Sequence, residues 1–217
     1  MSKKNKKNEK VKSRWWIGAI FTICSKIYLF LFYNVKIDRK VLKKQKRGCI
    51  LVYNHYSDKD HYFVAASSNC RRINYVLSSR FFFNKFLSFI LNLARSIKKD
   101  QFKPDLLAIR KIKKVIDQDG IIAIAPAGQI SINGAPIYVS PVIVKLIRMC
   151  KADVIALRMQ GTHLTCPKWS LSKRKCKINL TYLNGSPLPI GTTQDKINNA
   201  KNTISKKIKE KVNIGIT

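Results

Sequence analysis

Residues 49–60 read C-I-L-V-Y-N-H-Y-S-D-K-D and set the pattern of the chain. The first five are apolar or aromatic, and a short continuous run of such residues is typical of a buried β-strand. Polar residues follow the run, and the stretch from about 60 to 68 has the character of a helix. This segment therefore predicts a strand, a polar loop and a helix in succession, which is the repeating unit of an α/β fold.

Further strands and helices alternate along the chain in the same way. Extended segments are expected at residues 73–78, 121–125, 154–159 and 177–182. Helices are expected at residues 80–95, from Pro104 to Gly120, at residues 141–150 and at about 194–212. Proline suits the first turn of a helix and glycine its end, which sets the bounds of the second helix. The sequence therefore predicts an α/β protein with a mixed, largely parallel sheet flanked by helices.

The composition of the 217 residues limits both the class of protein and the chemistry of its partner. The length suits one domain with a sizeable core, and an apolar content of 46% excludes wholesale disorder. The 43 Lys and Arg residues against 11 Asp and Glu give a net charge of +32. Such an excess predicts an anionic partner: nucleic acid, an anionic membrane surface or a phosphorylated small molecule.

The cysteines indicate a reduced, cytoplasmic environment. The sequence has no C-x-x-C pair and no Cys and His residues with the spacing of a zinc site, so no metal is expected. A secretory signal is not expected either, because no small-residue cleavage site follows the N-terminal apolar stretch. The thiols are expected mostly as small buried apolar groups, and they are Cys24, Cys49, Cys70, Cys150, Cys166 and Cys176.

The N-terminal residues predict attachment to a membrane surface. Residues 1–14 carry seven basic groups and one acid and are expected to form a disordered tail. Such a tail is either simply solvated or held by anionic lipid headgroups, at about 1 kcal/mol per basic residue. Residues 15–35 are almost wholly apolar and aromatic, with Ser25 and Lys26 as an interruption. The second reading of the tail is favoured by this apolar segment beside it.

The interruption bears on how residues 15–35 meet the membrane. A spanning helix needs about 20 uninterrupted apolar residues, whereas Lys26 leaves two runs of about ten. Both flanks are basic, and basic flanks tend to stay on the cytoplasmic side. We therefore expect a helix at the cytoplasmic face of the cell membrane, with headgroup-level aromatics Trp15, Trp16, Tyr28 and Tyr33. A single span and a helix packed on the chain's own core are the alternatives.

His55 and Asp60 form the clearest candidate for catalysis. They are five positions apart, where a loop turns into the expected helix, so their side chains can meet. Asp60 would then hold one ring nitrogen of His55, which fixes the tautomer and makes the other nitrogen a stronger base. This is the orienting half of a catalytic triad without its serine, and it suits an enzyme whose substrate brings its own hydroxyl. Alternatively, His55 is a surface residue and Asp60 caps the helix.

A second polar loop follows the strand expected at residues 121–125. It reads A-P-A-G-Q-I-S from Ala125 to Ser131, and Gly128 permits a close approach of the backbone. In α/β sheets, ligands bind at the carboxyl ends of strands, where this loop and that of His55 are both expected. The backbone N–H groups around Gly128 are therefore candidates to stabilise an oxyanion.

These segments together resemble the 1-acylglycerol-3-phosphate acyltransferase family, also called lysophosphatidate or glycerolipid acyltransferases. The first block of the family, N-H-x-S-x-x-D, is matched in full by Asn54, His55, Ser57 and Asp60. Its third block, F-P-E-G-T-R-S, is followed only in part, through Pro126, Gly128 and Ser131, with Gln129 at the position of the threonine. Lys99, in residues 96–100, is the counterpart of the arginine of the second block. The fourth block resembles residues 153–157 ahead of Gly161, and the resemblance covers about residues 27–185.

The resemblance implies an O-acyltransferase of phospholipid biosynthesis without a bound cofactor or metal. An acyl-CoA, acyl carrier protein or acyl phosphate would donate a fatty acyl group to the free hydroxyl of a lysophospholipid. With 1-acylglycerol-3-phosphate as acceptor, the product is phosphatidic acid. Residues 36–217 would form the acyltransferase domain, with His55 as general base and Asp60 as its orienting group. The substrate-binding positions would be Asn54, Ser57, Lys99, Pro126, Gly128, Gln129 and Ser131.

Two residues depart from the family's pattern. Ala127 and Ile130 stand where its third block has a glutamate and an arginine that help bind the glycerol phosphate. Either the acceptor differs or is held by Lys98, Lys99 or Arg80, or the chain is a lipid-binding relative without activity.

A nucleic-acid-binding protein is the rival reading from another class, given the positive charge. Such a protein is expected to have a basic recognition helix, an aromatic-bearing sheet motif or zinc ligands. The sequence contains none of these patterns. A nucleic-acid partner is therefore not expected, and an anionic membrane surface is.

Overall fold

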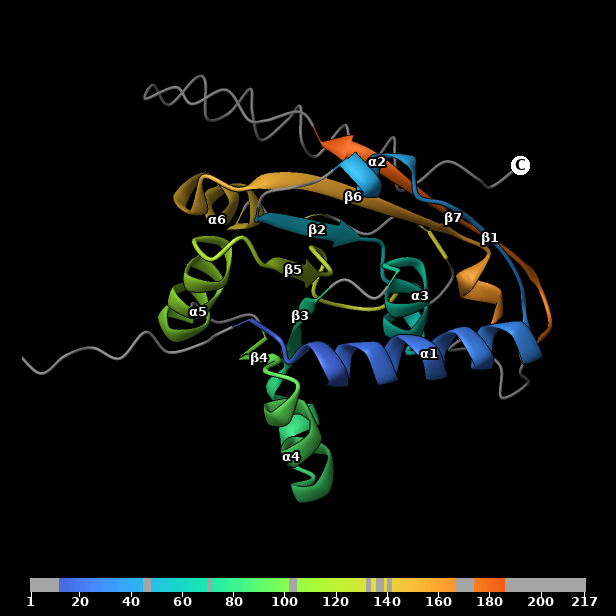
Figure 1. Ribbon diagram of the computed structural model, residues 1–217, viewed down its shortest axis with the longest axis horizontal. Helices are drawn as coiled ribbons and strands as arrows, with labels where there is room; N and C mark the ends of the chain where they lie inside the picture. Colours follow the sequence, from blue (N-terminus) through green and yellow to red (C-terminus); the bar gives the residue numbers. More distant parts are fainter. Residues whose placement is uncertain are drawn as a thin grey trace, which may run out of the picture.

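The computed structural model describes residues 12–44, 48–69, 72–101, 105–131, 134–135, 139, 142–166 and 174–185. These residues contain one seven-stranded sheet in the order β1-β7-β6-β2-β5-β3-β4 (Figure 1). The strands are β1 Asn34–Asp38, β2 Cys49–Tyr53, β3 Ile73–Ser78, β4 Ile97–Lys99, β5 Ile121–Ile124, β6 Asp153–Gln160 and β7 Lys177–Gly185. All neighbours are parallel except β6 and β7. The mixed, largely parallel sheet predicted from the sequence is confirmed.

Helices pack on both faces of this sheet. They are α1 Trp15–Phe32, α2 Lys40–Lys44, α3 Asp60–Ser67, α4 Lys85–Leu93, α5 Leu106–Ile116 and α6 Val142–Cys150, with the 3₁₀ helices η1 Ser79–Phe82 and η2 Thr162–Leu164. All five residues of β2 are buried. Because successive residues of a strand point to opposite faces, Ile50 and Val52 join one buried cluster and Leu51 and Tyr53 the other.

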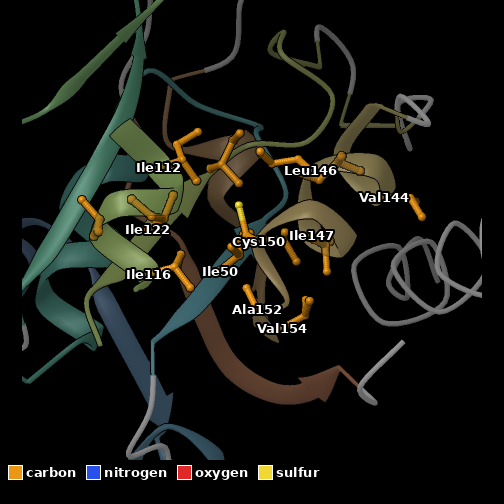
Figure 2. Packing of buried hydrophobic residues seen from close by; sticks show 14 of the residues in the cluster. Ile50, Ile112, Ile116, Ile122, Val144, Leu146, Ile147, Cys150, Ala152 and Val154 are labelled. Atoms are coloured by element: carbon orange, nitrogen blue, oxygen red, sulfur yellow. The ribbon is translucent and has the colours of Figure 1, made fainter. Parts of the chain in front are cut away.

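Each of the two clusters joins one face of the sheet to the helices on that side. Figure 2 shows the first cluster, where Ile112 of α5 and Ile147 of α6 pack with Ile50 of β2. The second cluster lies on the opposite face and includes Leu29 of α1 and Phe63 of α3. The central strands β2 and β5 are thereby fixed on both sides, which makes their carboxyl ends a rigid base for the loops that follow.

The predicted elements of the central part are found close to their expected bounds, with one difference in the segment 80–95. The single helix expected there is divided into η1 and α4. The side chain of Asn84 accepts a hydrogen bond from the backbone N–H of Leu87 at 3.0 Å, so it caps a new helix. The tail residues 1–11, Pro104 and the helix expected at 194–212 lie outside the described residues.

The strand β1 was not expected from the sequence. The membrane-associating segment predicted at residues 15–35 includes residues 34 and 35, but α1 ends at Phe32 and Asn34–Asp38 pairs with β7. Its side chains alternate between exposed and half-buried positions, as in an edge strand with one covered face. The chain thus passes from α1 directly into the sheet.

The helix α1 is continuous over 18 residues, so Ser25 and Lys26 interrupt the apolar sequence without breaking the helix. Among the described helices, α1 is the one that is long and apolar enough to cross a membrane. Its buried residues are mostly small and polar, namely Thr22, Ser25 and Leu29, and they face α3. Large apolar residues lie exposed, among them Trp15, Ile20, Ile23, Ile27 and Phe30. This distribution is the reverse of that on a surface helix of a soluble protein.

Candidate active site

The loops after β2 and β5 lie side by side at the carboxyl edge of the sheet. These two strands are parallel neighbours, so the residues that follow Tyr53 and Ile124 emerge at the same edge. The backbone N–H of Ser131 donates a hydrogen bond to the carbonyl oxygen of His55 at 2.9 Å. The two polar segments that the sequence singled out are therefore joined directly.

His55 and Asp60 form the contact at the centre of this edge. Asp60 is the first residue of α3, and its Oδ2 lies 2.9 Å from Nδ1 of His55. The Asp60 side chain is fully buried, whereas a quarter of the His55 side chain is exposed. An ionised carboxylate can only accept hydrogen bonds, so Nδ1 carries the proton that is donated. Nε2 is then the ring nitrogen with a free lone pair.

Two backbone groups hold the carboxylate of Asp60 in place for this contact. The N–H groups of Tyr56 and Ser57 donate to Oδ2 at 2.7 and 2.9 Å. Burial raises the pKa of the Asp60 carboxyl, and the hydrogen bonds from His55 and these two N–H groups act in the opposite direction. The donors thus stabilise the charged form of a group that burial disfavours.

Asn54 and Ser57 shape the loop that carries His55. The side-chain amide of Asn54 bridges to β6, donating to the Met159 carbonyl at 2.7 Å and accepting from the Met159 N–H at 2.8 Å. The Ser57 hydroxyl is fully buried and lies 3.1 Å from the hydroxyl of Thr165. Thr165 in turn donates to the carbonyl of Thr162. Both side chains hydrogen-bond within the protein. Ser57 therefore has a structural role in the loop and is not placed as a nucleophile.

The second loop exposes its backbone at Gly128. Gly128 has φ +69° and closes a turn through its N–H, which donates to the Ala125 carbonyl at 3.1 Å. A side chain at Gly128 would meet open space, so the backbone angle, and not crowding, favours glycine there. Gly128 and Gln129 are exposed and Pro126 is half-buried. Ser131 is buried, and its hydroxyl donates to the Ala135 carbonyl at 2.8 Å.

Lys99 lies at the same edge of the sheet but away from His55. It is the last residue of β4, and β5 and β3 separate that strand from β2, a distance of about 14 Å at the usual strand spacing. Within the described residues, its ammonium donates to the Asp100 carbonyl at 3.0 Å, and no hydrogen bond or ion pair joins it to His55. Gln101, two residues on, donates to the Gly128 carbonyl at 3.0 Å. β4 is thus tied to the loop of Gly128, while Lys99 itself is not brought to the His55–Asp60 pair.

Arg158 of β6 is a cation beside the site that sequence reasoning missed. β6 pairs with β2 on the side opposite to β5, so Arg158 emerges close to the His55 loop. Burial raises the pKa of the Tyr56 hydroxyl, and the charge of Arg158 lowers it, which reflects their proximity. No local pattern marks this arginine, because its place depends on the pairing of two strands far apart in sequence.

The other two histidines pack against aromatic or loop partners. His61 stacks on Phe21 of α1 with a centroid distance of 6.1 Å. Burial, together with the nearby His55, lowers the pKa of His61 to about 4. His163, in η2, lies edge-on to the ring of Tyr56 and against the backbone of Gly134. His61 is therefore part of the α1–α3 contact, and His163 is a neighbour of the His55 loop.

In the described part of the chain, no three His, Cys, Asp or Glu side chains lie close enough together to hold a metal ion.

The comparisons with known proteins agree with this architecture at the level of fold. No protein-family model matches the sequence, and no curated protein sequence matches it. Among solved structures, the chain is similar to the crystal structure of the 1-acyl-sn-glycerophosphate (LPA) acyltransferase PlsC from Thermotoga maritima. The TM-score is 0.69 at 13% sequence identity, and the match covers 93% of this chain and 80% of that chain. At this identity the similarity is one of fold.

Proposed function

We propose that this protein is an O-acyltransferase that moves a fatty acyl group from an activated donor to the free hydroxyl of a lysophospholipid. The observation that carries the proposal is the 2.9 Å contact between His55 Nδ1 and the buried Asp60, which leaves Nε2 available on a partly exposed ring. A base without a protein nucleophile suits a substrate that brings its own hydroxyl. The fold shared with PlsC, an LPA acyltransferase, supports the same reaction class.

The mechanism follows from the positions of these groups. Nε2 of His55 takes the proton of the acceptor hydroxyl while the oxygen attacks the acyl carbonyl carbon. Asp60 stabilises the imidazolium that forms, through the Nδ1 hydrogen bond. The N–H of Gly128 itself donates to the Ala125 carbonyl, so the backbone N–H of the exposed Gln129 is the candidate to stabilise the negative oxygen of the tetrahedral intermediate, at about 2.7–4 kcal/mol per donor. The intermediate collapses when the donor's leaving group departs with the proton of the imidazolium.

The acceptor in this proposal is 1-acylglycerol-3-phosphate or a close relative, and the product is then phosphatidic acid. A phosphate needs cationic or N–H donors. Ala127 and Ile130 supply no charge, so the cation must come from another part of the carboxyl edge. Lys99 on one side and Arg158 on the other are the two candidates, and Arg158 lies next to the catalytic loop.

We further propose that the reaction takes place at the cytoplasmic face of the cell membrane. The exposed side of α1 carries Trp15, Trp16 and a row of isoleucines and phenylalanines, which suits burial among lipid acyl chains. The positive charge of the chain suits anionic headgroups. The acyl donor is an acyl-CoA, acyl carrier protein or acyl phosphate, and the reaction needs no bound cofactor or metal.

The missing charges of the third block favour one alternative, a lipid-binding relative that lacks activity or uses another acceptor. Mass spectrometry of lipids after incubation of the pure protein with a panel of lysolipids and the three donor types distinguishes these possibilities. A new acylated lipid identifies both substrates of an enzyme. Tight binding of a lysolipid without any acylated product identifies the inactive relative.

A further inference from the structure

The segment from η1 to α4 exposes an unusual amount of aromatic surface. Phe83, Phe86 and Phe89 are 79%, 75% and 65% exposed, and Phe81, Leu87 and Ile90 are exposed as well. No residue of α4 is buried, although six of its nine residues are Phe, Leu or Ile. A helix of this composition is expected to bury its apolar side chains against some partner.

The position of α4 in the fold explains why the sheet does not cover it. The segment connects the neighbouring parallel strands β3 and β4, and such a crossover helix usually lies on the face of the sheet. The helix α5 does so and buries Ala108, Ile112, Val115 and Ile116. In contrast, α4 projects from the body of the molecule, with η1 as its main neighbour (Figure 1).

The charges around α4 indicate what kind of surface covers it. Residues 79–99 contain five basic residues and no acidic one. Of these, Arg80, Lys85 and Lys98 are exposed. A second copy of the chain is a poor partner for this segment, because it carries the same net charge of +32. An anionic bilayer matches both features, since it presents negative headgroups above an apolar interior.

We infer that η1 and α4 form a membrane-inserting wedge that binds anionic phospholipid bilayers, separate from α1. The wedge lies on the same side of the sheet as α1 and projects farther from the sheet than α1 does (Figure 1). Nine helical residues span about 13 Å, which is enough to carry the phenylalanines through the headgroups to the acyl boundary. Insertion would bring β4, with Lys98 and Lys99, close to the headgroups.

The test measures vesicle binding of the full chain with three serines in the wedge, F83S/F86S/F89S. The matched control is L106S/L107S/V142S, which removes three comparably exposed apolar residues from α5 and α6. Vesicles of phosphatidylcholine mixed with phosphatidylglycerol serve as the probe, and vesicles of phosphatidylcholine alone test the charge requirement. We expect the wedge variant to bind the mixed vesicles at least about tenfold more weakly than wild type, and the control to bind within about twofold of it.

The outcomes separate this inference from its alternatives. Equal binding by wild type and the wedge variant, or equal losses in the wedge variant and the control, overturns it. Loss of self-association by the wedge variant in sedimentation, with vesicle binding unchanged, would instead assign the surface to a second copy. The inference does not depend on the reaction: His55→Ala protein is expected to bind vesicles like wild type, so a failure of the acyltransferase proposal shows only in the lipid products.

Discussion

At the scale of single residues, the carboxylate of Asp60 determines which nitrogen of His55 can act as a base. It accepts from Nδ1 of His55 and from the N–H groups of Tyr56 and Ser57 at the same oxygen, Oδ2. The orientation of the His55 ring therefore depends on the Asp60 carboxylate, which the loop N–H groups hold in position. A neutral amide at this position can fill the space but can also donate to Nδ1, which would place the proton on Nε2.

Asp60→Asn is expected to lower turnover by about 10²–10⁴-fold, because Nε2 loses its lone pair in part of the molecules and the imidazolium loses its partner. Steady-state kinetics of the purified variant measures the effect, with thermal unfolding as a check that the fold is kept. A loss smaller than about tenfold would mean that Asp60 does not orient the base.

Lys99 and Arg158 are the two candidate contacts for the phosphate of the acceptor. If Lys99 binds the phosphate, Lys99→Met should raise the KM of the acceptor by about 10–100-fold, the worth of a hydrogen bond to a charged group, and leave that of the donor unchanged. Lys98→Met is the matched control, since Lys98 is the exposed neighbour one residue away in the strand. An unchanged acceptor KM in Lys99→Met together with a raised one in Arg158→Met would move the contact to β6.

The sequence predicted the contact between His55 and Asp60 but not the surroundings of this pair. His55 and Asp60 lie five positions apart, so local pattern was enough to place them together. The neighbourhood of Arg158 arises from the pairing of β6 with β2, about 100 residues apart in the chain, which no local pattern reports. The distance of Lys99 from His55 is set in the same way, by the position of β4 at the edge of the sheet.

At the scale of elements, α1 is tied to the helix that carries Asp60. Phe21 of α1 stacks on His61 of α3, and Lys59, the residue before Asp60, donates to the Tyr33 hydroxyl at 3.3 Å. The Lys59 ammonium also lies 5.6 Å from the centre of the Tyr28 ring. The proposed membrane helix and the start of α3 therefore form one packed unit.

The low pKa of His61 makes this contact sensitive to pH. His61 titrates near 4 in the folded protein and near 6.5 when unfolded, so the unfolded state takes up its proton first as the pH falls. Above pH 6.5, His61 is neutral in both states and does not affect the free energy of unfolding. Between about pH 6.5 and 4, protonation of the unfolded state lowers the free energy of unfolding by at most about 3 kcal/mol.

His61→Phe should remove this loss because phenylalanine keeps the ring and has no proton to bind. Urea unfolding at about pH 7.5 and about pH 4.5 measures the effect, and wild type should lose more stability between the two than the variant. Equal losses in the two proteins would show that His61 is not held neutral by its packing.

The predictions for elements were good where apolar runs are bounded by polar residues and poor where they are not. Strand β3 and helix α3 follow clear boundaries, so their bounds were close to those observed. Ten of residues 80–95 are apolar and the six polar ones are spread among them, so the hydrophobic pattern did not reveal that the cap at Asn84 divides η1 from α4. Strand β1 was missed because it directly follows an apolar helix and forms only through pairing with β7.

At the scale of the whole molecule, positive charge and exposed apolar surface act together. Both α1 and α4 present large apolar side chains to solvent, and the chain carries an excess of 32 positive charges. Charge attracts the protein to an anionic surface over distances limited by salt, while apolar contact acts only after arrival. The two contributions should therefore respond differently to ionic strength.

High salt is expected to release the wild-type protein from anionic vesicles only in part, because screening leaves the burial of the α1 side chains intact. I23S/I27S/F30S, at three exposed positions of α1, should increase the fraction that salt releases, while the phenylalanines of α4 hold the remainder. Substitution is preferable to deletion of α1, because Leu29 belongs to the core. Complete release of wild type by salt alone, in a flotation assay, would contradict burial of α1 in the bilayer.

Lipid mass spectrometry on purified wild-type and His55→Ala proteins, with 1-acylglycerol-3-phosphate and each class of acyl donor, tests whether His55 is the base of an acyltransferase. The mechanism predicts that wild type forms phosphatidic acid with at least one donor and that His55→Ala forms it at least about 10²-fold more slowly, with an unchanged thermal unfolding curve. If wild type forms no acylated product with any donor, or if His55→Ala keeps more than about a tenth of the wild-type rate, His55 is not the base of an acyltransferase of this kind.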